Sequence, residues 1–164
     1  MNTFTKAAFA AFMSAGIAHA HDYTIADVTI THPMTFETAK AVNVAGGYMT
    51  LENNGDTDDK LIEVRVTTIP HVELHLSETD ANGVARMTKQ DGIPVPAGET
   101  VVLKPGGLHV MFMGLNGDPF ELGEEIPATL VFEQAGEVEV IFNVEERSTH
   151  DHSGMDHSGH KMSD

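Results

Sequence analysis

The sequence contains no cysteine and few basic residues, and each shortage excludes a class of function. Without cysteine, this 164-residue chain cannot form a disulfide, a cysteine-ligated zinc site, an iron–sulfur cluster or a thiolate nucleophile. Nine Lys and Arg stand against 25 Asp and Glu, a formal net charge of −16. Nucleic acids and anionic lipid surfaces attract clustered basic side chains, so this charge argues against both partners. Any soft-metal chemistry must therefore use Met sulfur and His nitrogen.

Long apolar runs are also scarce, and the only extended one lies in the first twenty residues. Residues 1–20 carry Lys6, an apolar stretch from Ala7 to about Ala18, and then the triplet Ala18-His19-Ala20. This order is typical of a secretory signal peptide, and the stretch is too short to remain as a membrane-spanning helix. We expect cleavage after Ala20, export to the periplasm and no stable membrane insertion. A retained membrane anchor is the alternative.

Between Tyr23 and Val144, short β-type runs are separated by Gly, Pro, Asn and Asp, and no amphipathic helix of three turns is indicated. This spacing predicts one all-β domain over residues 21–147, a Greek-key sandwich of the immunoglobulin-like type. Pro94 and Pro96 are expected in a connection. The predicted strands are Tyr23–Thr31, Val44–Asn53, Lys60–Thr67, His71–Ser77, Val84–Lys89, Thr100–Leu103, Leu108–Leu115, Ala128–Phe132 and Val138–Val144.

Two of these segments alternate between apolar residues and potential metal donors. Side chains two residues apart in a strand share a face, so residues 108–113 present core residues on one face. Their opposite face carries His109, Met111 and Met113. Residues 71–76 alternate in the same way, and their second face carries His71, Glu73 and His75.

The connection after His75 favours bringing a third segment to the same place. A loop of about five residues centred on Ala81 would place Met87 opposite His75. Two imidazoles and two thioethers are uncharged, soft-to-borderline ligands, which favour Cu(I) over Ca²⁺ or Mg²⁺. Zinc fits such a thioether set poorly. A lone Met on a strand more often fills the core, and a lone His more often lies on the surface, than either binds a metal. The long-range spacing of the four residues therefore decides between a metal site and these ordinary roles.

The spacing resembles that of the PCuAC family of periplasmic copper chaperones. Ten residues lie between position 76 and Met87, and twenty-one separate Met87 from His109-Val110-Met111, as in the signature H(M)x10Mx21HxM. The blocks at residues 46–53, 72–75, 93–98 and 103–111 are similar to recurring blocks of that family. The resemblance implies a cupredoxin-like sandwich in which His75, Met87, His109 and Met111 bind one Cu(I). It also implies delivery of copper to a partner such as a cytochrome c oxidase subunit or a Sco-type assembly factor, for assembly of the oxidase copper centre.

The chain departs from the signature at one position and adds one donor. The optional Met beside the first His is Leu76, which alternation directs to the core, so its absence should matter little for binding. Met113 is an auxiliary candidate ligand on the predicted metal face, with core or rim packing as the alternative. We expect His71 to lie on the surface.

After residue 147 the composition changes abruptly. Residues 148–164 contain no Leu, Ile, Val, Phe, Tyr or Trp that could anchor them in a core, so the sequence predicts a disordered, mobile tail. Short His-rich tracts bind metals, which makes this tail a candidate second site, for Cu(II). A merely solubilising tail is the alternative. At the other end of the chain, cleavage after Ala20 would leave His21 as the first residue, which is a weaker candidate copper ligand. The tail donors are His150, His152, Met155, His157, His160 and Met162.

Several function classes compete with a chaperone. A periplasmic copper buffer for resistance would use the same donors and is favoured by the tail. A copper redox enzyme is disfavoured because thioethers bias copper towards Cu(I), and blue electron-transfer sites normally use the absent cysteine thiolate. No G-x-S-x-G or H-E-x-x-H motif suggests a hydrolase. A plain adhesive sandwich would leave the donor spacing as an accident, so the sequence predicts a binding protein rather than an enzyme.

Overall fold

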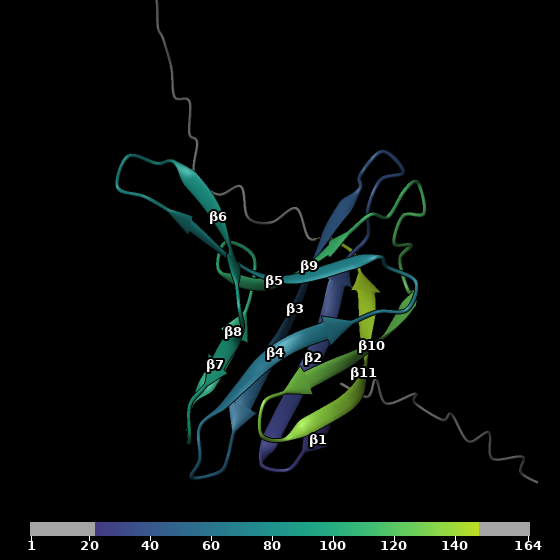
Figure 1. Ribbon diagram of the computed structural model, residues 1–164. Coiled ribbons are helices and arrows are strands. Elements are labelled where there is room, and N and C mark those ends of the chain that lie inside the picture. The colour runs from purple at the N-terminus through teal and green to yellow at the C-terminus, as the bar shows by residue number, and fades with distance from the viewer. Residues whose placement is uncertain (1–21, 148–164) are drawn as a thin grey trace, which may run out of the picture.

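The structure is a computed structural model that describes residues 22–147, and every regular element in that range is a strand (Figure 1). Within this range there is also no helix long and apolar enough to cross a membrane. The strands are β1 (Tyr23–Ile25), β2 (Val28–Phe36), β3 (Val44–Asn53), β4 (Asp59–Arg65), β5 (His71–Thr79), β6 (Ala85–Gln90), β7 (Ile93–Val95), β8 (Thr100–Leu103), β9 (Leu108–Met113), β10 (Glu125–Phe132) and β11 (Gly136–Glu145).

The strands follow one another in the order β6-β5-β9-β3-β2-β11-β10-β4-β7, with β1 added beside β2 and β8 beside β3. The β11–β2 pair is parallel, and the other strand pairs of the described chain are antiparallel. The folded-over sheet encloses an apolar core, in which Phe112 of β9 meets Phe142 of β11 at 5.4 Å between ring centroids. The predicted all-β sandwich is therefore confirmed.

Three local differences from the predicted strands have physical causes. The first predicted strand is two strands, because the chain turns at Ala26, whose φ is +48°. Strand β2 then continues to Phe36 because an irregularity in its pairing with β3 accommodates His32 and Pro33. Pro94 lies inside β7 rather than in a connection, which is tolerated because β7 is an edge strand paired only with β4.

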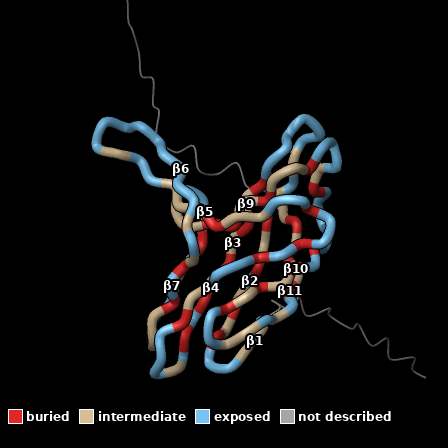
Figure 2. Tube along the Cα trace, viewed as in Figure 1, coloured by how far each residue is buried: buried red, intermediate tan, exposed pale blue. Residues whose placement is uncertain are grey.

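The strands with the predicted donors lie at one end of this order. Strand β9 is held between β3 and β5, whereas β6 is the terminal strand and pairs only with β5. Figure 2 shows the β5–β6 hairpin as a mostly exposed arm that projects from the core, while β9 is largely buried. The fold thus combines a firmly held donor strand with a peripheral one.

Candidate metal centre

His75 and His109 face each other across the β5–β9 pair. They occupy directly opposite positions in the antiparallel register, and their ring centroids are 5.9 Å apart. Side chains opposite each other on antiparallel strands share a face, which explains how residues 34 positions apart become neighbours. His109 is only 5% exposed, and its strand β9 is flanked within the sheet by β3 and β5.

The hydrogen bond of His109 defines which of its nitrogens is free. Its Nδ1 lies 2.9 Å from the carbonyl oxygen of Gly107. A carbonyl only accepts hydrogen bonds, so Nδ1 carries the proton and donates. In the neutral ring the lone pair is then on Nε2, which is the nitrogen available to a metal.

His75 makes a different contact. Its Nε2 lies 2.8 Å from Oε2 of Glu73, and the other oxygen of Glu73 accepts a hydrogen bond from Nζ of Lys89 at 2.7 Å. The hydrogen bonds from His75 and Lys89 hold the pKa of the Glu73 carboxyl below its usual value. The Nδ1 of His75 is buried and has no hydrogen-bond partner in the described part of the chain.

The two Met residues reach this region from neighbouring strands. Met111 follows His109 by two residues in β9 and therefore shares its face, opposite Glu73. Met87 lies on β6 opposite Ser77, so the expectation that it would lie directly opposite His75 is wrong; Lys89 occupies that position.

The turn explains the shifted register. The backbone N–H of Asp80 donates to the carbonyl oxygen of Val84, the N–H of Val84 donates to Oδ1 of Asp80, and Gly83 adopts a left-handed φ of +79°. The loop therefore has three residues and is centred on Asn82, one residue later than expected. Met87 still lies on the face of His75, as its diagonal neighbour.

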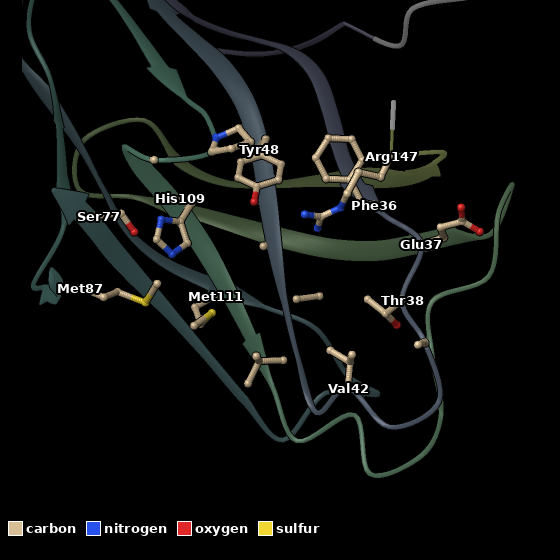
Figure 3. A pocket seen from close by; sticks show the side chains of 16 residues that line it. Phe36, Glu37, Thr38, Val42, Tyr48, Ser77, Met87, His109, Met111 and Arg147 are labelled. Carbon is tan, nitrogen blue, oxygen red and sulfur yellow. The ribbon is translucent and has the colours of Figure 1, made fainter. Parts of the chain in front are cut away.

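An open pocket of about 450 Å³ connects three of the four predicted ligands. Met87, His109 and Met111 line one side of it, and Figure 3 shows their side chains directed into the same space. Phe36 and Tyr48 form the other side, together with the guanidinium of Arg147, which lies 5.0 Å from the Phe36 ring centroid. Burial raises the pKa of the Tyr48 phenol, and the nearby Arg147 charge partly offsets this rise.

The other candidates are placed differently or lie outside the described residues. Met113 pairs with Val44 and with His71 at the far end of β9, and it does not line this pocket. His71 is exposed, as expected for a surface residue. The tail donors and His21 fall outside residues 22–147, so their copper sites stay predictions.

Glu73 was expected on the ligand face without a role, and no role was expected for Lys89. Alternation is a sufficient signal for Glu73, because it precedes His75 by two residues. Lys89 could be found only from the hairpin register, which differs by two residues from the predicted one. Residues 22–147 contain no group of three or more His, Asp or Glu that could hold a metal. The pocket is lined by the imidazole of His109 and the thioethers of Met87 and Met111.

Fold and site together define an all-β sandwich with a candidate soft-metal centre at one end of its sheet. Residues 28–144 match the family described as "Putative lipoprotein LpqE-like", and the chain belongs to this family. A relative from Leifsonia xyli subsp. xyli, named "Putative lipoprotein Lxx21020", is 32% identical over 96 residues, which cover 56% of this chain. The match spans only 57% of the length of that relative.

Solved structures of PCuAC domains share the fold. The apo PCuAC domain from PmoF1 is 28% identical with a TM-score of 0.68, and the match covers 77% of this chain and 100% of that domain. The copper-bound PCuAC domain from PmoF2 is 30% identical with a TM-score of 0.66, covering 77% and 99%. The CuI-DR1885 structure from Deinococcus radiodurans is 26% identical with a TM-score of 0.58, covering 80% and 85%.

Proposed function

We propose that this protein is an extracytoplasmic copper chaperone that holds Cu(I) through His75, Met87, His109 and Met111. The observation that carries the proposal is the convergence of three of these side chains on one open pocket, with His75 beside His109. Copper-bound neighbours of the same fold support it. Uncharged imidazole and thioether donors suit the monovalent ion better than harder cations.

The placement of Met87 suits transfer rather than permanent storage. Met87 is 51% exposed and lies on the terminal strand, whereas His109 is buried on an interior strand. A ligand on a peripheral strand is displaced by an incoming donor at lower cost than a buried one, because few packed contacts move with it. In this proposal the partner replaces Met87 first, and copper leaves by ligand exchange without catalysis.

The lipoprotein relatives support a location outside the cytoplasm, and we propose the periplasm after cleavage at Ala20. The recipient in this proposal is a cytochrome c oxidase subunit or a Sco-type assembly factor. The net charge of −16 would assist docking to a basic patch on such a partner.

A copper buffer for resistance is the second candidate, favoured by the six His and Met donors between positions 150 and 162. The two functions differ in what happens to bound copper. A chaperone transfers Cu(I) to an apo oxidase copper domain faster than free dissociation allows. A buffer transfers it only at the rate at which copper dissociates.

Competition titration with a Cu(I) chelator under reducing conditions tests the main site. We expect one tightly bound Cu(I) in residues 21–147, and a large loss of affinity when His109 is replaced by Ala. His71→Ala is the matched control, because His71 is an exposed imidazole on the neighbouring strand. Equal affinities of the wild-type chain and His109→Ala would contradict the proposal.

A further inference from the structure

Glu73 connects His75 to Lys89 through both of its carboxylate oxygens. Oε2 contacts Nε2 of His75 at 2.8 Å, and Oε1 accepts from Nζ of Lys89 at 2.7 Å. The cross-strand register explains the arrangement, because Lys89 lies directly opposite His75 on β6 and Glu73 lies two residues away on β5. The side chain of His75 is 13% exposed and that of Glu73 is 28% exposed, so this contact is partly buried.

The contact determines which nitrogen of His75 carries the proton. An ionised carboxylate can only accept, so Nε2 of His75 must be the donor. In the neutral ring the lone pair is then on Nδ1, the buried nitrogen that lacks a partner within residues 22–147. A buried polar atom without a partner carries a desolvation cost, which a bound metal ion would remove.

We infer that Glu73 is a positioning residue that makes His75 a ligand through Nδ1, while His109 binds through Nε2. This inference rests on the proposed function. The two imidazoles then differ in ligating atom because their second nitrogens have different acceptors, the Glu73 carboxylate for His75 and the Gly107 carbonyl for His109. Such outer contacts orient a ligating ring and raise its basicity.

Lys89 helps to hold Glu73 in the position from which it contacts His75. Its ammonium holds the second oxygen of Glu73, which limits the rotation of the carboxylate away from His75. Lys89 is 60% exposed at its side chain, so the ion pair by itself contributes little to stability. Its effect is therefore expected on the geometry of His75 rather than on folding.

The test combines Cu(I) affinity with long-range proton–nitrogen NMR correlation of the His75 ring, in the apo and Cu(I)-loaded full chain. The variants are Glu73→Leu, which removes the acceptor, Glu73→Gln, which keeps a carbonyl acceptor, and Lys89→Met. Glu78→Leu is the matched control, because Glu78 is an exposed carboxylate on the same strand. Unfolding curves of the apo variants show whether each one folds.

In the wild type we expect a proton on Nε2 in both states and a copper-induced shift of the Nδ1 resonance. Glu73→Leu should redistribute the proton between the nitrogens and weaken Cu(I) binding by about 10–100-fold. Glu73→Gln should retain the Nε2 proton with a smaller loss, and Lys89→Met should lie between the wild type and Glu73→Leu.

A copper-induced shift at Nε2 of His75, or identical affinity and proton position in Glu73→Leu and Glu78→Leu, would overturn the inference while leaving the chaperone intact. A wild-type chain that does not bind Cu(I) would instead contradict the proposed function. The proton position in apo protein separates the two failures, because it is measured without copper.

Discussion

His75 and His109 lie opposite each other on β5 and β9 with 5.9 Å between their ring centroids. Met87 on β6 lies two residues away from the position opposite His75. The centre therefore has a fixed part, contributed by an interior strand, and a peripheral part, contributed by the edge of the sheet. This division leads to a specific expectation for Met87, the ligand on the terminal strand.

Met87→Leu should separate copper binding from stability. Because Met87 is 51% exposed on the terminal strand, we expect the free energy of unfolding of the apo protein to change by less than about 0.5 kcal/mol. The affinity for Cu(I) should fall because one sulfur ligand is lost. Denaturant unfolding and chelator competition measure the two effects. Val84→Thr, at an equally exposed apolar position before the same strand, should change neither; a stability loss above 2 kcal/mol in Met87→Leu would contradict the peripheral placement.

The core beneath the centre predicts a sensitive glycine. A Cβ on Gly47 would lie 2.8 Å from one ring carbon of Phe112 and 3.0 Å from one of Phe142, and both rings are fully buried. Since neither ring can move freely, Gly47→Ala should destabilise the protein by about 1–3 kcal/mol. Gly107→Ala is the control, because its added carbon would meet only ordinary contacts at 3.6 Å or more. Equal unfolding midpoints for the two variants would show that β9 packs less tightly than described.

The wall of the pocket predicts a pH effect. Burial raises the pKa of the Tyr48 phenol above its usual value of 10.0. The unfolded chain then loses this proton at lower pH than the folded one, so the free energy of unfolding should decrease as the pH rises above 10. Ultraviolet titration of Tyr23→Phe, which leaves Tyr48 as the remaining tyrosine, measures the pKa directly. A phenol titrating below 10 would contradict the buried placement.

The tail prediction is independent of the main site. Truncation after Arg147 should remove Cu(II) binding by the six donors between positions 150 and 162 and leave one Cu(I) per chain. Isothermal titration with each oxidation state measures both numbers. Unchanged stoichiometry for both states would reject a metal-binding tail and favour the solubilising alternative.

Much of the architecture follows from local sequence signals, and the exceptions have specific causes. The bounds of β3 and β8 agree with the prediction because clear apolar patterns end at turn residues on both sides. Strand β7 was missed because three residues around Pro94 form a strand only by pairing with the edge of β4. Tertiary pairing, rather than propensity, decides such a segment.

The candidate centre shows the same limit. Period-two alternation correctly placed His109 and Met111 on one face of β9, and Glu73 and His75 on one face of β5, because the strand pleat alone determines the face. The partner across a hairpin depends on turn geometry, and the left-handed Gly83 shifted the pairing of Met87 from His75 to Ser77. The contact between Glu73 and Lys89 follows from that register and was not predicted.

X-ray absorption on the Cu(I)-loaded protein tests the central claim most directly. The chain truncated after Arg147, which lacks the tail donors and carries no substitution, should show two sulfur and two nitrogen scatterers around copper. Met87→Leu and Met111→Leu should each leave one sulfur. Two sulfur scatterers retained in both variants, or a wild-type ion with only nitrogen and oxygen neighbours, would contradict the four-ligand site.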